Sequence, residues 1–401
     1  MRLQLQPLFI ICFLMGMAIG PAAFAQSDYD ANGLRVKRIF SDAENAALSE
    51  PFKGVFTEDD VPTDLFPVRS TGVSTAPIMN AAKSFLGQLT PAQLIKTQYA
   101  VDDSEWRKWS NVDNGIYVRQ GVSLEEMSES QKKAAVELLS ASLSAKGLGL
   151  SFDIMKTDQT LRELNDNSFV FGEEKYFFTI MGVPDATEPW GWQLDGHHLI
   201  INYFVMGDQV VVTPMFLGGE PIVTATGKYA GNEILQDEQN LGLALLQALD
   251  TEQRNIAVLH SDKQRNNLQA KAGKDNLVLN YEGIAATELS IEQSKQLVDL
   301  IALFVNNIRD DQARVHMEDV LQHLDDTYFA WIGGSTDDAV FYYRIHSPVI
   351  LIEFDHQNPV GNPGAVPGVP TRQHIHVMVR TPNGNDYGKD LLRQHLETHK
   401  H

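Results

Sequence analysis

Apolar residues recur at helical spacing in separate blocks of this chain, with polar residues at the positions between them. The spacing predicts helices over residues 76–89, 128–144, 152–164, 233–249, 252–259, 290–307, 311–324 and 390–399. Ser290-Ile-Glu-Gln293 is a capping-box pattern at the start of one helix, and Ser123-Leu-Glu-Glu126 is another just before the helix at 128. We expect Gly147 and Gly149 to end that helix, because glycine favours helix C-termini.

Short runs rich in aromatic and β-branched residues lie between the helical blocks. They predict strands over residues 176–181, 191–206, 209–217, 340–346, 349–355 and 374–380. Gly207-Asp208 and Ser347-Pro348 are suited to tight connections between neighbouring strands. Because the strands follow one another through tight turns while the helices stand in blocks, we expect an α+β fold. Its central sheet should be largely antiparallel and flanked by amphipathic helices. No internal repeat is apparent in the sequence.

The first 25 residues have the layout of a secretory signal peptide. Arg2 supplies a positive charge, residues 7–20 are apolar, and Ala23-Phe24-Ala25 gives small residues before a cleavage point. An uncleaved membrane anchor is the alternative, but the apolar stretch is short for a spanning helix. We therefore expect a periplasmic or secreted protein without stable membrane insertion.

The rest of the chain divides by composition. Residues 26–78 are polar, with weak periodicity, and are interpreted as an N-terminal arm or linker. Residues 79–401 then form a single large α+β domain, although the length also allows two. The sequence does not indicate an oligomeric state.

Charge and cysteine content narrow the possible partners and cofactors. The formal net charge of −20, without a cluster of basic residues, argues against nucleic acid and leaves a small molecule as the expected partner. The one cysteine, Cys12, lies in the predicted signal peptide. A metal ion in the mature chain would therefore be bound by histidine, aspartate or glutamate. Such ligands favour zinc, with iron, copper or manganese as alternatives.

The most specific local motif is His374-Ile375-His376, at the head of a predicted strand. Side chains alternate along a strand, so the two imidazoles share a face and can chelate one metal ion. The alternative is a pair of surface or hydrogen-bonded histidines. We predict both residues as metal ligands.

Two acidic residues on another predicted strand could lie beside these histidines. Glu353 and Asp355 share one face of residues 349–355, and pairing of the two strands would bring them to the imidazoles. We predict Asp355 as a metal ligand and Glu353 as a proton acceptor. The alternative is that both carboxylates form ion pairs with Arg344 or Arg380.

Adjacent histidines follow a stretch that is rich in tryptophan and glycine. Since His197 and His198 point in opposite directions in a strand, one can reach the metal while the other orients a different element. Trp190 and Trp192, together with Asn202, are predicted to line a substrate pocket. The alternative is an aromatic corner of the core.

Four further polar residues complete the predicted site. Glu188 is a second possible proton acceptor, and Arg344 or Arg380 would bind a carboxylate or stabilise developing negative charge. His395 is expected near the substrate pocket, with interaction with the helix dipole as its alternative role.

A set of motifs in one order resembles the family known as domain of unknown function 3500. They are Leu139-Leu-Ser-Ala-Ser-Leu-Ser, Tyr176-Phe-Phe-Thr-Ile-Met-Gly, Thr187-Glu-Pro-Trp-Gly-Trp-Gln-Leu-Asp-Gly-His-His-Leu, Tyr281-Glu-Gly-Ile, Phe329-Ala-Trp-Ile-Gly-Gly, Phe341-Tyr-Tyr-Arg-Ile, Leu351-Ile-Glu-Phe-Asp, His374-Ile-His and Asn385-Asp-Tyr-Gly-Lys-Asp-Leu-Leu-Arg-Gln-His. The resemblance that they carry extends over about residues 102–399. The resemblance implies the domain assignment and supplies no reaction.

The residues favour a secreted metal-dependent enzyme, a hydrolase acting on a small or medium-sized substrate. In this hypothesis the metal lowers the pKa of a bound water and a carboxylate accepts its proton. A redox enzyme with iron, copper or manganese on the same ligands is one alternative. A non-catalytic protein that binds a ligand or a metal is another.

Overall fold

The protein was analysed as a computed structural model that describes residues 31–58 and 64–398. The predicted signal peptide, residues 1–25, lies outside the described residues. Within the described part of the chain, no helix is long and apolar enough to cross a membrane.

The fold is α+β and is built on a mostly antiparallel sheet of 13 strands, as the sequence predicts. The sheet runs in the order β11-β12-β13-β14-β15-β8-β6-β5-β4-β2, with β3 on β4, β7 on β6 and β9 on β12. The main strands are β4 (Tyr176–Met181), β5 (Trp190–Gly196), β6 (Leu199–Met206), β7 (Gln209–Val211), β8 (Met215–Gly219), β12 (Tyr328–Gly333), β13 (Phe341–His346), β14 (Leu351–His356) and β15 (Ile375–Arg380). Short strands are β2 (Gln98–Tyr99), β3 (Val122–Ser123), β9 (Val258–His260) and β11 (Ile284–Ala285); a separate parallel pair is β1 (Gly54–Phe56) with β10 (Asn276–Val278).

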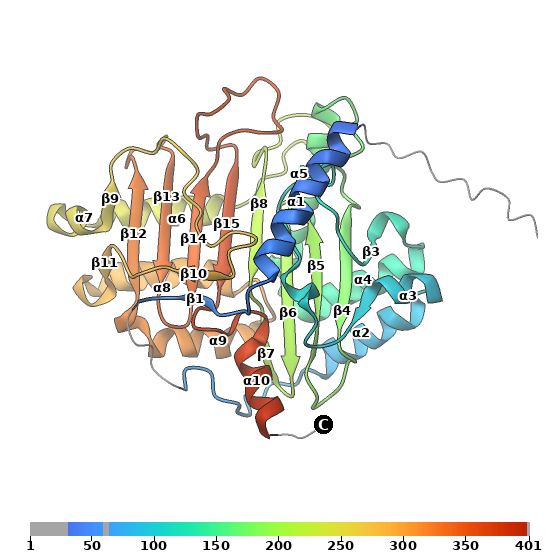
Figure 1. Ribbon diagram of the computed structural model, residues 1–401. Helices are drawn as coiled ribbons and strands as arrows, with labels where there is room; N and C mark the ends of the chain where they lie inside the picture. Colours follow the sequence, from blue (N-terminus) through green and yellow to red (C-terminus); the bar gives the residue numbers. More distant parts are fainter. Residues whose placement is uncertain (1–30, 59–63, 399–401) are drawn as a thin grey trace, which may run out of the picture.

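Helices cover one face of this sheet and a thinner layer covers the other (Figure 1). The helices are α1 (Ala31–Leu48), α2 (Ala76–Gln88), α3 (Pro91–Thr97), α4 (Glu129–Ser142), α5 (Ala145–Leu164), α6 (Gln236–Ala248), α7 (Thr251–Ala257), α8 (Ile291–Val305), α9 (Asp310–Gln322) and α10 (Lys389–Thr398). Helices α4, α5, α6 and α8 lie behind the sheet, whereas α1, α10 and the β1–β10 pair lie in front of it.

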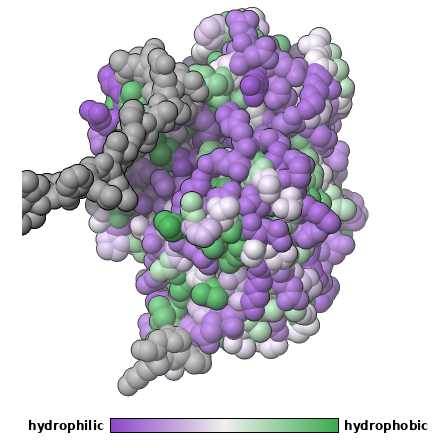
Figure 2. All heavy atoms as spheres, turned by 90° about the vertical axis from the view of Figure 1, so that its right-hand side faces the viewer, coloured by the Kyte–Doolittle hydropathy of each residue, from purple (hydrophilic) through white to green (hydrophobic). Residues whose placement is uncertain are grey.

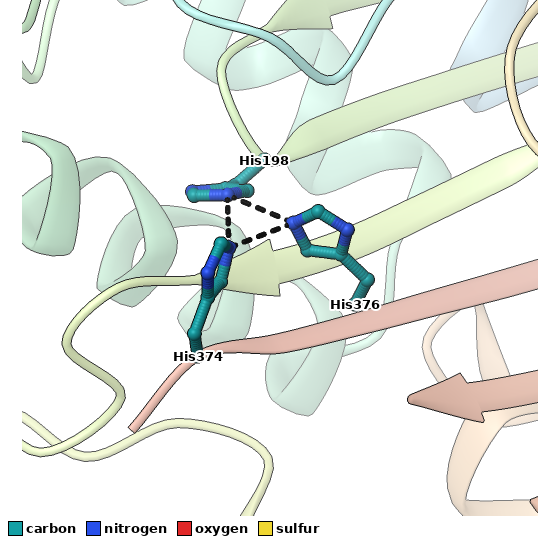
Figure 3. A group of neighbouring side chains, drawn as sticks. All are labelled: His198, His374 and His376. Atoms are coloured by element: carbon teal, nitrogen blue, oxygen red, sulfur yellow. Dashed lines mark hydrogen bonds between the residues drawn. The ribbon is translucent and has the colours of Figure 1, made fainter. Parts of the chain in front are cut away.

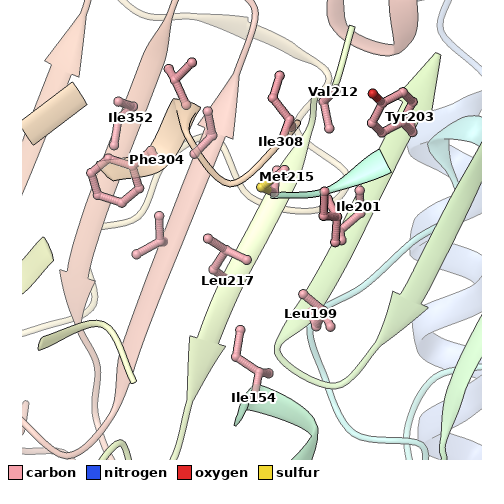
Figure 4. Packing of buried hydrophobic residues seen from close by; sticks show 14 of the residues in the cluster. Ile154, Leu199, Ile201, Tyr203, Val212, Met215, Leu217, Phe304, Ile308 and Ile352 are labelled. Carbon is pink, nitrogen blue, oxygen red and sulfur yellow. The ribbon is translucent and has the colours of Figure 1, made fainter. Parts of the chain in front are cut away.

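The larger core lies between the sheet and the rear helices. Leu199, Ile201, Met215 and Leu217 project from the central strands and pack against Ile154 of α5 and other helical residues (Figure 4). A second core on the front face contains Trp106, Trp109, Phe204 and Leu391. Both faces of the central strands are therefore buried, which explains why their sequences are apolar with only isolated polar residues. In contrast, Figure 2 shows that the face on the right-hand side of Figure 1 is mainly hydrophilic.

The strand registers reveal an internal duplication, so the expectation of no repeat is wrong. Phe178 pairs with Leu194 in the first half, and Phe329 pairs with Ile345 in the second. Phe178 and Phe329 differ in residue number by the same amount as Leu194 and Ile345. When this difference is added to the β5–β6 pair Gln193 and Asn202, it gives the β13–β14 pair Arg344 and Glu353. The two strand triplets β4-β5-β6 and β12-β13-β14 therefore have the same topology and register. Some equivalent positions keep their residue type, as Phe178 and Phe329 do, but Gln193 and Asn202 differ in chemistry from Arg344 and Glu353, which makes the repeat weak in the sequence.

Flanking elements repeat in the same way. β2 and β9 pair in parallel with β4 and β12, and β3 and β11 pair antiparallel with the same two strands. Gly121 and Gly283 precede β3 and β11 with φ of 89° and 90°. A Cβ on either would lie 2.2 or 2.1 Å from a backbone oxygen of β4 or β12. The two halves meet where β8 pairs antiparallel with β15, so the molecule has an approximate two-fold relation.

Several segments differ from the predicted elements. The strand predicted over 191–206 is divided into β5 and β6 by a turn at His197 and His198, so these residues do not alternate along a strand, and the strand predicted over 209–217 is divided into β7 and β8. Gly147 and Gly149 do not end a helix but lie inside α5. A Cβ at Gly147 would sit 1.9 Å from the backbone oxygen of Asn307, so glycine is required there for close packing and not as a helix end. Within the predicted arm, residues 31–48 form α1 and residues 54–56 pair with β10.

Candidate metal centre

Three histidines from the two halves meet at one end of the central strands. His198 lies in the tight turn between β5 and β6, whereas His374 immediately precedes β15 and His376 is the second residue of that strand. Strand alternation brings the latter two to the same face, as predicted. Figure 3 shows the three imidazoles pointing toward one another.

The turn places His198 in an uncommon backbone conformation. Its φ is 62°, in the left-handed region, and its N–H donates to the carbonyl oxygen of Asn111 at 3.3 Å. Histidine tolerates this region better than most residues do, at a cost of about 1–2 kcal/mol. Packing against residues far away in the sequence maintains this geometry, which directs the ring to the centre.

A glycine opposite His376 leaves room for its ring. Gly218 of β8 is the cross-strand partner of His376. A Cβ at Gly218 would lie 2.7 Å from the backbone oxygen of Ile375 and 3.2 Å from Cδ2 of His376. The position of the His376 imidazole therefore depends on the absence of a side chain at residue 218.

The three Nε2 atoms form a small triangle. His374 and His376 are 2.9 Å apart, His198 and His376 3.1 Å, and His198 and His374 3.3 Å. Around a tetrahedral zinc ion with Zn–N bonds of about 2.0–2.1 Å, ligand nitrogens lie about 3.3 Å apart. The triangle is thus within a few tenths of an ångström of the dimensions of a metal centre. No other group of three His, Cys, Asp or Glu residues in the described chain has ligand atoms within 4.8 Å of one another.

Hydrogen bonding alone cannot satisfy this triangle. An imidazole nitrogen is either an N–H donor or a lone-pair acceptor, never both. At most two of the three contacts can therefore pair a donor with an acceptor, and the third must oppose two like groups. A cation at the centre removes the conflict, because all three nitrogens then act as lone-pair donors.

The outer ring nitrogen of His374 has the partner that a metal ligand needs. Its Nδ1 donates to the carbonyl oxygen of Asn358 at 2.8 Å, which leaves the Nε2 lone pair free in the neutral ring. A Glu220 oxygen lies 3.6 Å from the same Nδ1. Glu220 also accepts backbone N–H groups of Val360 and Gly361 at 3.1 and 2.7 Å, so it joins the loop after β14 to the histidine.

His197 supports the centre rather than joining it. Its ring stacks on that of His198 with centroids 3.9 Å apart, and its Nδ1 lies 2.6 Å from Oδ1 of Asp158 on α5. Of the two adjacent histidines, His198 is therefore the one that faces the centre. His197 orients its neighbour through this stacking contact, so the choice between the two histidines that the sequence left open is decided in favour of His198.

Burial keeps the three imidazoles neutral. Desolvation is the main cause that lowers the pKa of His198 and His376 well below the usual histidine value. It also lowers the pKa of His374, against the opposing charge of Glu220. Neutral imidazole is the form that binds a metal ion.

The predicted carboxylates are near the centre in the sheet but have other partners. Asp355 is the cross-strand partner of His376, so the predicted strand pairing is confirmed. Its carboxylate instead binds Nζ of Lys263 at 2.6 Å and the N–H groups of Asn267 and Leu268. The prediction of Asp355 as a metal ligand is corrected, because both of its carboxylate oxygens are bonded to residues 263–268.

Glu353 is occupied in a similar way. Its two oxygens accept the backbone N–H groups of Gln269 and Ala270 at 2.9 and 2.7 Å, and one also accepts the Tyr342 hydroxyl. A buried carboxylate with these bonds anchors the chain segment in front of the sheet. The prediction of Glu353 as a proton acceptor at the centre is corrected for this reason.

The other predicted polar residues also have structural partners. Arg380 binds Asp275 and Asp386 at 2.9 and 3.1 Å, and Arg344 binds Glu282. Both arginines are buried. Neither guanidinium belongs to the histidine group, so their predicted catalytic roles have no support in the geometry.

The predicted pocket residues do not meet the histidines. Trp190 and Trp192 pack in the rear core, on the face opposite to His376. Asn202 is fully buried and bonds to Gln193 and to the carbonyl oxygen of Pro214. These residues correspond to the alternative of an aromatic corner of the core.

Glu188 and His395 contact each other at the other end of β5. Their side chains lie 3.3 Å apart, with Glu188 just before the strand and His395 on α10. His198 lies two residues after the other end of the same strand. A strand of this length separates the pair from the centre by about 20 Å or more.

Comparison with known proteins assigns the chain to a family without a described activity. A family model described as "Protein of unknown function (DUF3500)" matches residues 71–389, a span that contains all three histidines. No curated protein and no solved structure matches the chain.

Proposed function

The chain belongs to the DUF3500 family, and on that premise we propose that it is a metal-dependent enzyme with one divalent ion on His198, His374 and His376. The observation that carries the proposal is the Nε2 triangle, whose contacts cannot all be hydrogen bonds. The set uses three ligands and thus leaves a further coordination position, which is the pattern of a catalytic rather than a structural zinc site.

We favour zinc and hydrolysis over the redox alternatives. Non-haem iron is commonly held by two histidines and a carboxylate, but Asp355 and Glu353 are bonded to Lys263 and to backbone N–H groups. Three imidazoles in a compact triangle suit the tetrahedral preference of zinc. Zinc in such a site supplies a Lewis acid that lowers the pKa of a coordinated water to about 7.

The protein's own residues position the ligands in this proposal. Asn358 fixes the tautomer of His374, Glu220 holds the adjacent loop, and the stacked ring of His197 limits rotation of His198. His376 is the least buried of the three, so a substrate would approach on its side. The predicted signal peptide supports action in the periplasm or outside the cell, on a small or medium-sized molecule.

Metal content is the first test of the proposal. Elemental analysis of the full chain, purified without chelators, should find about one zinc per chain. The double variant His374→Ala/His376→Ala should lose it, whereas His260→Ala, which removes an exposed histidine, should retain it. Equal metal content in the double variant and the wild type would exclude the centre.

Activity is tested separately. Zinc-loaded protein should hydrolyse at least one member of a panel of chromogenic esters, amides and phosphoesters. Dipicolinate should abolish that activity and added zinc should restore it. Full zinc occupancy without turnover of any member would favour a non-catalytic metal protein, and turnover that survives metal removal would contradict the mechanism.

A further inference from the structure

A cavity of about 100 Å³ lies at the end of β14 and β15 remote from the histidines. Its walls are mainly aliphatic and include Val212, Met215, Ile308, Val349 and Leu391. An engineered apolar cavity of about 150 Å³ binds benzene, so a space of this size suits a compact small molecule.

The internal duplication makes this cavity the counterpart of the histidine centre. Phe204 of β6 and Asp355 of β14 are equivalent positions of the two halves. The cross-strand partner of Phe204 is Val211, and that of Asp355 is His376, so Val211 corresponds to His376. Val349, which lies just before β14, corresponds in the same way to His198, which lies just before β6. Both valines line the cavity. The duplicated position therefore carries metal-ligating side chains in one half and apolar side chains in the other.

The third counterpart helps to close the cavity. Met206 and Gln357 are also equivalent positions. Met206 pairs with Gln209 and Gln357 pairs with His374, so Gln209 corresponds to His374. The Gln209 side chain accepts the N–H of Arg69 at 2.7 Å and donates to the carbonyl oxygen of Pro67 at 3.1 Å. It thereby holds residues 65–71, which cover the cavity.

A half-exposed ion pair marks the edge of this cover. Arg69 and Asp319 are 2.7 Å apart, with side chains 39% and 40% exposed. Such a pair contributes about 0–1 kcal/mol. Opening of the cover for a ligand would therefore cost little at this contact.

One buried donor gives the cavity a polar point. Gln312 lines it and is 1% exposed, and its Nε2 has no hydrogen-bond partner among the described residues. A buried amide N–H₂ without a partner costs about 1–3 kcal/mol, so a hydrogen-bond acceptor in the cavity would be favourable. The negative net charge of −20 disfavours an anion as that acceptor.

We propose that this cavity binds a small, neutral, mainly apolar molecule with one carbonyl acceptor directed at Gln312. The site is distinct from the histidine centre and needs no metal ion. Aliphatic walls would bury the body of the molecule, and the single donor would fix its orientation.

Methyl NMR of the full chain labelled at methionine tests the proposal with cyclohexanone as the probe. The Met215 methyl, assigned with Met215→Leu, should shift saturably, whereas Met378, which does not line the cavity, should not. Absence of a saturable Met215 shift up to the solubility limit of the ketone would overturn the proposal.

Methylcyclohexane provides the matched probe without an acceptor. Gln312→Leu should weaken cyclohexanone binding about five- to tenfold and leave methylcyclohexane binding unchanged or stronger. Equal cyclohexanone affinity in wild type and Gln312→Leu would reject the role of the donor. The Met215 shift is measured on the wild-type chain, so the test of binding in the cavity remains valid even if Gln312→Leu folds poorly.

Discussion

The backbone of Asp355 lies directly opposite that of His376 in the sheet, yet its carboxylate binds Lys263 rather than a metal-site imidazole. Both members of this ion pair are fully buried. The centre thus consists of neutral histidines, and the neighbouring charges stabilise the segment that covers the front of the sheet.

Asp355→Asn should therefore affect stability and leave metal binding intact. The substitution leaves the Lys263 ammonium buried without its counter-charge, which costs about 3–5 kcal/mol. Chemical denaturation measures the loss, and elemental analysis of the folded fraction measures the metal. A loss of zinc without a change in unfolding free energy would mean that Asp355 is a ligand after all.

Gly218→Ala should weaken the metal centre. The new Cβ would meet the Ile375 backbone oxygen at 2.7 Å and the His376 ring at 3.2 Å, so the imidazole must shift. We expect at least a tenfold loss of zinc affinity, measured by competition with a chelating dye. Gly149→Ala is the matched control, since nothing lies within 4 Å of its Cβ position inside α5. If both variants bind zinc like the wild type, the ring position is not critical.

Glu220→Gln should loosen the support of His374. The carboxylate accepts N–H groups of Val360 and Gly361, and its charge lies close to the His374 ring. Loss of such an outer contact commonly lowers metal affinity about 10- to 100-fold. The same dye competition checks this value, and hydrogen exchange at residues 360–362 should accelerate. Unchanged affinity together with faster exchange would show that the loop and the metal are not linked.

Acid should destabilise the protein partly through His346, away from the centre. Burial, with Arg344 nearby, lowers the pKa of His346 to about 3, from about 6.5 in the unfolded chain. Between these pH values the unfolded state binds the proton and the folded state does not. The unfolding free energy therefore falls as pH falls, by up to about 1.4 kcal/mol per pH unit for this residue.

His346→Phe isolates that contribution, because phenylalanine can keep the ring contact with Tyr281 at 4.6 Å but does not titrate. Urea denaturation from pH 7 to pH 4 should show a flatter pH dependence for the variant than for the wild type. Parallel curves would indicate that His346 is protonated in the folded state.

Local patterns were sufficient for much of the fold. Runs of aromatic and β-branched residues predicted β4, β13, β14 and β15, and the alternation of side chains along a strand placed His374 and His376 on one face. The glycines of α5 were misread, because the close approach of Asn307 to Gly147 is a tertiary contact. The duplication was missed in the sequence because many equivalent positions differ in residue type, as Asn202 and Glu353 do, and only scattered positions such as Gly121 and Gly283 are the same.

The site was predictable only where its geometry is local. His198 could be named as one of an adjacent pair, but its orientation depends on a left-handed turn residue and on the ring of His197. Glu220 and Asp158 lie far from the other site residues in the sequence and carry no motif. The partners of Asp355 were missed for a similar reason, since Lys263 and the N–H groups of 267 and 268 come from an irregular segment.

X-ray absorption at the zinc edge of the metal-loaded full chain tests the central claim most directly. The account predicts a first shell with three imidazole nitrogens at about 2.0–2.1 Å and one additional light atom, with loss of one imidazole in His198→Ala. A shell dominated by carboxylate oxygens, or one that is identical in wild type and His198→Ala, would contradict it.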